Sequence, residues 1–198
     1  MFTGIITHQG TFRGYRKGRR AVLVGAPGLA GKVAAGDSVS VSGVCLSVVA
    51  AERDGILFDL SRETSEKTTL GALAAGARLN LEPALTLATP LSGHLVSGHV
   101  DGLGTVLRMS SRPPGKRLTV AFPAALGPFF VAKGSVAVDG VSLTIAALGP
   151  SSFEAELIPL TLGSTGLGLL RAGAKVNLEC DMIGKYVYNY LSRGRKKG

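Results

Sequence analysis

Two short polar rows carry the side chains best suited to chemistry. Cys45 and Ser47 alternate with aliphatic residues, so the thiol and the hydroxyl share one face of a predicted strand. Ser142 and Thr144 repeat the arrangement 97 positions further on. Such a face is an ordinary solvent-facing row unless it lines a pocket. If it does, its groups suit the binding of a polyol or the edge of a heterocycle.

Motifs for other chemistry are incomplete. The GAPGLAGKV segment from Gly25 has Ala30 in place of the second glycine of a phosphate loop and Val33 in place of the magnesium-binding Ser or Thr. His94 and His99 are five positions apart, which on a strand would place them on opposite faces, and no cysteine or acidic cluster accompanies them. We therefore expect no metal site.

The composition indicates a packed, strand-rich protein. Apolar residues make up 45% of the 198 positions, and 28 glycines, nine prolines and no tryptophan suit short strands joined by tight turns. Two cysteines are too few for a disulfide framework. Neither a membrane-spanning run nor a secretion signal is evident. A cytoplasmic protein with free thiols and no membrane association is expected.

The formal charge of +9 comes from short clusters. Twelve of the 22 basic residues lie in three segments. These residues are Arg13, Arg16, Lys17, Arg19 and Arg20; Arg112, Lys116 and Arg117; and Arg193, Arg195, Lys196 and Lys197. This pattern favours solvated loops over a phosphate-rich partner, and with only 6% aromatic residues a stacking platform for nucleic acid is not expected. We expect the 13–20 loop to lie away from the residues singled out for chemistry.

Internal repetition decides the architecture. Ser38–Val48 matches Ser135–Ile145, and Thr68–Glu82 matches Thr165–Glu179, both at an offset of 97 residues, while a fainter pair beginning at Thr3 and Ser97 is offset by 94. Two similar domains of about ninety residues follow, each large enough to bury a core. The predicted units are residues 1–88, residues 89–180, and a helix with a basic tail at residues 181–198.

About six short strands per repeat predict a small antiparallel barrel. Alternating apolar residues place first-repeat strands at 4–11, 21–25, 56–60 and 78–82, with counterparts in the second repeat. The alternation changes phase at Gly43, which predicts one strand with a bulge or sharp bend.

Helical spacing appears only near the C-terminus. Ile183, Tyr186, Val187, Tyr190 and Leu191 form an apolar stripe after Asp181, a suitable N-cap, in a predicted helix over 181–193. The stripe either folds back on a barrel or meets its equivalents in other subunits. We favour the second arrangement.

Five separated segments together resemble the riboflavin synthase family, in order and nearly end to end. They are MFTGII at the start, GHLVSGHVDGLGT from Gly93, KGSVAVDGVSLT from Lys133, LIPLTL from Leu157 and VNLECDMIGKYV from Val176. The resemblance implies an all-β fold of two tandem six-stranded antiparallel Greek-key barrels. It also implies a homotrimer assembled by the C-terminal amphipathic helix, with an active site where the N-terminal barrel of one subunit faces the C-terminal barrel of another.

The resemblance further implies a reaction. One 6,7-dimethyl-8-ribityllumazine donates a four-carbon unit to a second, giving riboflavin and 5-amino-6-(D-ribitylamino)uracil without a cofactor. Because one substrate loses a proton from its C7 methyl group and the other accepts a nucleophile at C7, the two sites should differ. The repeat alignment places Cys45 against Ser142, Glu63 against Leu160 and Ile5 against His99.

Site roles are carried over by resemblance. His99 is the candidate proton shuttle and Cys45 the candidate nucleophile or base, with Ser142 and Thr144 also catalytic. The alternatives are a structural role for His99 and pocket lining for Cys45. The substrate-binding candidates are Gly4, Ile5, Ile6, Cys45, Leu46, Ser47, Asp59, Leu60, Ser61, Arg62, Glu63, Thr64, Gly98, His99, Val100, Lys133, Ser142, Leu143, Thr144, Leu157, Ile158, Pro159, Leu160, Thr161 and Leu162.

Some positions depart from the family pattern. Leu160 stands where histidine or glutamate is common and Ser42 where asparagine is common, and residues 88, 89 and 92 differ as well. A non-catalytic paralogue that binds lumazine or flavin therefore stays an alternative. Retention of His94 together with the four catalytic candidates favours the enzyme.

Overall fold

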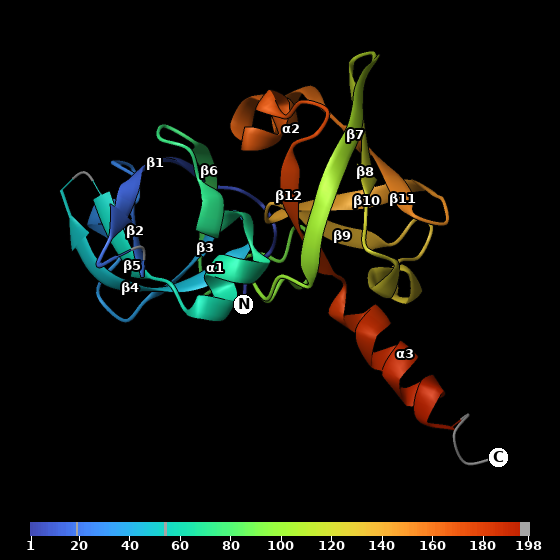
Figure 1. Cartoon of the computed structure of the whole chain (residues 1–198), viewed down its shortest axis with the longest axis horizontal. Coiled ribbons are helices and arrows are strands. Elements are labelled where there is room, and N and C mark those ends of the chain that lie inside the picture. The colour runs from blue at the N-terminus through green and yellow to red at the C-terminus, as the bar shows by residue number, and fades with distance from the viewer. Residues whose placement is uncertain (19, 54, 195–198) are drawn as a thin grey trace.

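The computed structural model describes residues 1–18, 20–53 and 55–194 as two closed six-stranded barrels and a projecting C-terminal helix (Figure 1). The strands of the first barrel are β1 (His8–Arg16), β2 (Ala21–Gly25), β3 (Ser38–Val41), β4 (Val44–Glu52), β5 (Gly55–Asp59) and β6 (Arg78–Pro83). Those of the second are β7 (Gly102–Arg112), β8 (Gly115–Ala121), β9 (Ser135–Val138), β10 (Val141–Leu148), β11 (Ser152–Leu157) and β12 (Lys175–Cys180).

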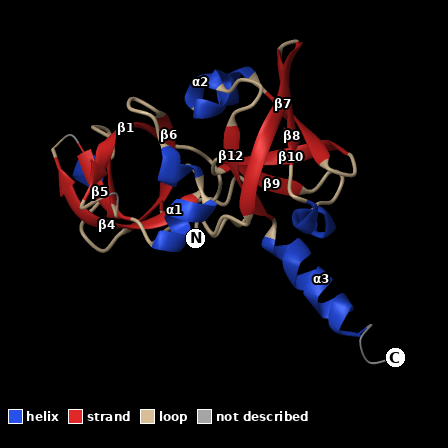
Figure 2. Cartoon of the chain, in the orientation of Figure 1, coloured by secondary structure: helices blue, strands red, loops and turns tan. Residues whose placement is uncertain are grey.

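Both barrels have the same strand order. The first closes as β1-β2-β5-β4-β3-β6 and the second as β7-β8-β11-β10-β9-β12, the equivalent antiparallel Greek-key circuit. Helices are short apart from the last, as Figure 2 shows. They are α1 (Arg62–Lys67), α2 (Pro159–Ser164) and α3 (Met182–Gly194), with 3-10 turns η1 (Ala30–Lys32), η2 (Thr69–Ala72), η3 (Ala124–Phe129) and η4 (Gly166–Leu169). The predicted fold class is confirmed.

Strand alternation gives each barrel its core. Along β4 the side chains of Val44, Leu46 and Val48 are buried, whereas Cys45 and Ser47 between them are not. This is the expected separation of an apolar inner face from a polar outer face. β2, β5 and β6 match the predicted strands to within one residue, but β1 begins at His8, because Gly4 and Ile6 contact the other barrel and the chain rejoins its own barrel only at Thr7, whose amide donates to Leu81 on β6.

The prediction of one strand with a bulge or bend at Gly43 is wrong. The chain reverses direction there, and two antiparallel strands, β3 and β4, meet at the turn. Ser42 (φ 46°) and Gly43 (φ 82°) form a two-residue turn that joins β3 to β4 as a hairpin. Two consecutive positive φ values are typical of a type I′ turn, whose twist matches that of paired strands. Asp139 (φ 45°) and Gly140 (φ 78°) form the equivalent turn between β9 and β10. The change of phase in the apolar alternation therefore marks the turn between two strands and not a bend within one strand.

These two turns meet at the junction between the barrels. A Cβ on Gly43 would lie 2.7 Å from the backbone nitrogen of Gly140, and the reciprocal distance is also 2.7 Å, so only glycine allows this approach. The side chain of Asn80 donates to the carbonyl of Asp139 (2.9 Å), and that of Asn177 donates to the carbonyl of Ser42 (2.8 Å). The junction is thus reciprocal, with each barrel bonding the turn of the other.

Helix α3 begins where the cap was predicted. An Oδ1 atom of Asp181 accepts from the amide of Ile183 (3.0 Å), and Lys185 pairs with Asp101 at 2.8 Å. The predicted stripe does not fold back, because its members are more than half exposed and α3 points away from both barrels (Figure 1). Among the described residues, no helix combines the length and apolar character needed to cross a membrane.

Candidate functional site

The segment that precedes each barrel crosses to the other barrel. Phe2 and Val96 pair at the crossing, with N–H to O distances of 2.7 and 3.0 Å. Beyond it, the carbonyl of Gly4 accepts from the amide of Ser142 (2.8 Å), and the carbonyl of Gly98 accepts from the amide of Cys45 (2.8 Å). The lead segment of each repeat therefore covers the first residue of the polar row of the other repeat, Cys45 or Ser142.

The first site is a hollow of about 280 Å³ beside Cys45. Six predicted residues line it, and three others were missed. The predicted ones are Cys45, Glu63, Thr64, Gly98, His99 and Val100; the missed ones are Val44, Lys67 and Thr68. The four-residue spacing from Glu63 to Lys67 on a short helix was the signal that could have found Lys67.

Helix α1 forms one wall of this hollow. Ser61 caps it by accepting from the amide of Thr64 (3.0 Å). Lys67 donates to Glu63 at 2.8 Å, and this hydrogen bond lowers the pKa of Glu63 and raises that of Lys67. Both groups are exposed at the rim, so they offer opposite charges to a polar chain entering the hollow.

Other candidates of the first repeat do not line the hollow. Leu46 and Leu60 belong to the barrel core, and Ser47 and Asp59 face solvent. Lys17 contacts Asp59 at 3.1 Å, so the expectation that the basic loop lies away from the candidate residues is wrong at this point. Arg62 pairs with Glu66, its neighbour one helical turn later on α1.

The second site centres on Ser142. Gly4 lies so close to it that an added Cβ would be 2.7 Å from the Ser142 Cβ, and Ile6 packs on the core of the second barrel. Thr144 is exposed on the same strand face, and Ile5 is exposed as well.

The remaining second-repeat candidates divide between core and surface. Leu143 and Leu157 are buried in the core, and Leu162 packs against it. Lys133, Ile158, Pro159 and Leu160 are exposed, and α2 starts at the proline. The carbonyl of Thr161 accepts from Thr165 and closes the helix.

His94 contributes a contact that the sequence analysis missed. Its Nδ1 lies 2.7 Å from the Oγ of Ser142, and its Nε2 is buried with no hydrogen-bond partner among the described residues. Burial lowers the pKa of His94, against an opposing effect of Asp181, so the imidazole is neutral at neutral pH. Spacing could not reveal this pair, because 48 residues separate its members and residues 93–100 form no regular strand.

The two sites therefore present different pairs of candidate reactive groups. The first has the half-buried Cys45 thiol with His99 in one hollow, and the second has the Ser142 hydroxyl with His94. The other cysteine, Cys180, is buried, and burial together with the nearby Asp101 raises its pKa to about 12. Cys45 is thus the more accessible thiol of the two.

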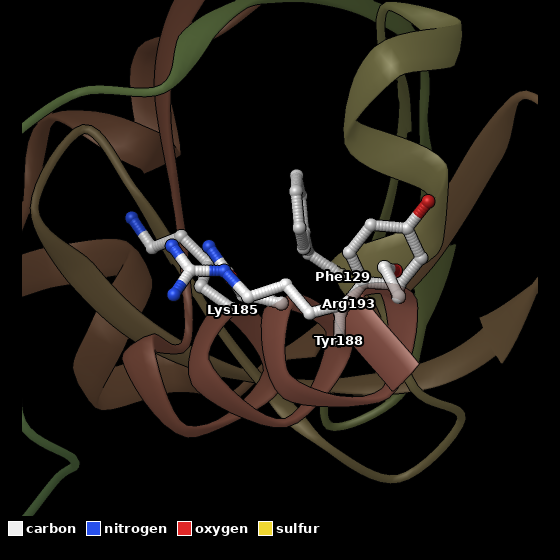
Figure 3. Close-up of a pocket in the computed structure, with 6 residues that line it drawn as sticks. Phe129, Lys185, Tyr188 and Arg193 are labelled. Carbon is white, nitrogen blue, oxygen red and sulfur yellow. The ribbon is translucent and has the colours of Figure 1, made fainter. Parts of the chain in front are cut away.

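Two further hollows follow α3. One of about 450 Å³ lies between α3 and η3 and is lined by Phe129, Lys185, Tyr188 and Arg193 among others (Figure 3); it contains no candidate site residue. The other, of about 300 Å³, is lined by His99 together with Met182 and Tyr186. His99 therefore borders both the Cys45 hollow and the base of α3.

Two tandem closed barrels with unlike polar groups at the equivalent positions 45 and 142 define a duplicated β-barrel protein. The comparisons with known proteins give its family. The lumazine binding domain family matches residues 3–84 and 97–181. Riboflavin synthase of Bacillus subtilis (strain 168) is 37% identical over 198 residues, covering 99% of this chain and 92% of that protein. Riboflavin synthase of Mycobacterium bovis is 40% identical over 197 residues, covering 94% and 96%.

Solved structures show the same fold. LumP complexed with riboflavin superposes with a TM-score of 0.83 at 23% identity, covering 91% of this chain and 99% of that one. LumP complexed with 6,7-dimethyl-8-(1′-D-ribityl) lumazine gives 0.80, also at 23%. The chain belongs to the riboflavin synthase family of lumazine-binding proteins. The resemblance drawn from the five sequence segments is confirmed.

Proposed function

We propose that this protein is a riboflavin synthase that converts two molecules of 6,7-dimethyl-8-ribityllumazine into riboflavin and 5-amino-6-(D-ribitylamino)uracil. One observation carries the proposal: the equivalent repeat positions 45 and 142 carry different groups, the Cys45 thiol in a hollow with His99 and the Ser142 hydroxyl bonded to His94. A dismutation uses two identical substrates in unlike roles, so it needs like binding sites with unlike chemistry. Near full-length similarity to riboflavin synthases favours the enzyme over a non-catalytic carrier.

The geometry supports a division of tasks. His99, beside the Cys45 thiol in the first hollow, is placed to move the proton of a C7 methyl group. At the second site the neutral imidazole of His94 can accept the Ser142 proton, which makes the hydroxyl oxygen a better nucleophile toward C7 of the other lumazine. Holding the two rings in the reacting orientation also lowers the activation barrier, by up to about 7–11 kcal/mol in favourable cases.

The active site is proposed to form between subunits of a homotrimer, where the N-terminal barrel of one faces the C-terminal barrel of the next. The exposed stripe on α3 supports assembly, because several large apolar side chains would otherwise remain in water. The position of His99 at the base of α3 would connect this assembly to the first site. We also propose the division into residues 1–88, 89–180 and 181–198, and a cytoplasmic location, which the unpaired state of Cys45 and Cys180 supports.

The deciding experiment follows exchange of the C7 methyl protons in deuterated solvent by NMR, alongside riboflavin formation. His99→Ala should lower turnover about a hundredfold or more, as is typical for loss of a general acid or base, while lumazine still binds. Cys45→Ser keeps a small polar group, so a mild loss would indicate pocket lining and a severe loss thiol chemistry. If the parent protein makes no riboflavin from lumazine, the proposed function is wrong; exchange and turnover at parent rates in His99→Ala would remove only its assigned role.

A further inference from the structure

Two buried glutamates lie at the barrel junction outside every predicted site. Glu82 on β6 and Glu179 on β12 occupy equivalent repeat positions and are only 4% and 3% exposed. A buried carboxylate is costly unless several donors satisfy it. Among the described residues neither has an ion-pair partner within 4 Å, so their role must be found in the hydrogen bonds that they accept.

Glu179 holds the lead segment of the second repeat. It accepts from the amide of Ser97 (2.6 Å), from the hydroxyl of Ser97 (2.7 Å) and from the amide of Gly98 (2.9 Å). The Ser97 hydroxyl in turn accepts from the amide of His99 (3.2 Å), while the Gly98 carbonyl accepts from the amide of Cys45. A short chain of hydrogen bonds therefore runs from Glu179 to both members of the first reactive pair.

Glu82 repeats the arrangement for the first repeat. It accepts from the amide of Thr3 (2.7 Å), from the hydroxyl of Thr3 (2.7 Å) and from the amide of Gly4 (3.0 Å). The Thr3 hydroxyl accepts from the amide of Ile5 (3.0 Å), and the Gly4 carbonyl accepts from the amide of Ser142. Burial raises the pKa of Glu82 while the Thr3 and Gly4 donors lower it, as expected for a carboxylate held by neutral groups.

Each glutamate thus stands on one barrel and acts on the site of the other. We propose that Glu179 is a positioning residue for the Cys45–His99 site on the first barrel, and that Glu82 is a positioning residue for the Ser142 site on the second. This inference rests on the proposed function for what the sites do, but the crossed arrangement itself is a property of the junction.

The geometry leaves little room for an alternative position of the segments. Gly98 has φ +80°, and an added Cβ would lie 2.6 Å from the Cys45 Cβ, so the backbone rests directly on the strand that carries the thiol. A glutamine at position 179 could still accept from Ser97, but its amide nitrogen would face the N–H of Gly98. Two donors would then oppose each other in a buried site, and the Gly98–His99 segment should move away from Cys45.

The test compares Glu179→Gln with its repeat-matched control, Glu82→Gln, in the full-length protein. Cys45 is the probe, because alkylation by iodoacetamide at pH 8 reports only on the first site while Cys180 is buried with its pKa raised to about 12. Without ligand, Cys45 should be alkylated several times faster in Glu179→Gln than in the parent. Glu82→Gln should react at the parent rate, although it loses the equivalent bonds. The riboflavin concentration that protects Cys45 should rise about tenfold or more in Glu179→Gln alone.

Two Ser97 variants keep the test decisive if Glu179→Gln folds poorly. Ser97→Thr should behave as the parent, because Thr3 makes the same bonds at the equivalent position. Ser97→Ala removes the hydroxyl between Glu179 and His99, so it should weaken protection in the same direction. The thermal unfolding temperatures of Glu179→Gln and Glu82→Gln should fall to a similar extent. A change in Cys45 alkylation seen only in Glu179→Gln then reports a local movement of the segment and not a loss of global stability.

The results distinguish this inference from the proposed function. Parent-like alkylation and protection in both Glu179→Gln and Ser97→Ala, or equal changes in Glu179→Gln and Glu82→Gln, would overturn the crossed arrangement. If riboflavin fails to protect Cys45 in the parent, the proposed function fails, and the ligand-free alkylation rates still decide whether Glu179 positions the first site.

Discussion

Asp139 makes stability at the barrel junction depend on pH. Its Oδ1 accepts from the amide of Asn177 (2.8 Å), and burial raises its pKa from 3.8 to about 7. The folded protein therefore binds this proton more tightly than the unfolded chain does. The resulting stabilisation is complete below about pH 4, is lost as the pH rises through about 7, and is absent above it. Ser42, at the equivalent turn position, accepts from the amide of Asn80 (3.3 Å) without any charge.

Above about pH 7 the folded protein holds a charged carboxylate at Asp139 in a buried position, which costs stability. Asp139→Asn should remove this cost. Asparagine keeps an oxygen for the amide of Asn177 and tolerates the φ of 45° at this position. Three pKa units correspond to about 4 kcal/mol, and because the residue keeps some exposed surface we expect a gain of about 1–2 kcal/mol at pH 8. At pH 4 the aspartate is protonated in the folded protein, so the two proteins should differ little.

The assay is urea unfolding of parent and Asp139→Asn from pH 4 to pH 8. Both proteins are measured at one concentration, because the proposed assembly would make stability depend on concentration. Ser42→Asn is the matched control, because it places an amide in the equivalent turn where no charge is lost. Its difference from the parent should not vary with pH. A difference between Asp139→Asn and the parent that is the same at pH 4 and pH 8 would refute the assignment of this titration to Asp139.

Two further predictions concern assembly and charge. Truncation after Cys180 removes the exposed α3 stripe and should give monomers by light scattering, whereas the full-length chain should be a trimer; a monomeric full-length protein or a trimeric truncated one would contradict the role of α3. Neutral substitutions at Arg16, Arg19 and Arg20, which keep the ion pair of Lys17 with Asp59, should lower the amount of nucleic acid that co-purifies with the protein. The rate of riboflavin formation should not change. A large loss of turnover would show that the loop covers the site.

The repeat made the architecture predictable, and alternation made the strand faces predictable. A two-residue period identifies which side chains of β4 point outward, because that geometry is local to one strand. The same local reasoning failed at Gly43, since a phase change is also produced by a hairpin turn with two positive φ values. A dipeptide of the Asp-Gly type, as in the second repeat, is the stronger hairpin signal and was available at position 139.

The crossing of the lead segments could not be predicted from spacing. Gly4 meets Ser142 and Gly98 meets Cys45 through backbone hydrogen bonds between different repeats, and no periodicity within one segment encodes a partner so distant. The contact between His94 and Ser142 was missed for the same reason, because it exists only once the linking segment lies across the second barrel. The similarity to the family supplied the names of site residues, whereas the structure supplied their grouping.

The crossing also explains how two repeats arrive at unlike sites. Each site combines a strand of one repeat with the lead segment of the other, so both repeats contribute to both sites. A change of one residue, in a strand or in a lead segment, alters one site and leaves its counterpart unchanged. Glu63 lines the first hollow, whereas its counterpart Leu160 is 73% exposed and offers an apolar side chain where the first site has a charge. The departure at Ser42 belongs to the junction, where its hydroxyl still accepts from Asn80 and its φ of 46° still closes the turn. Neither departure removes a member of the two reactive pairs, which is why both are compatible with turnover.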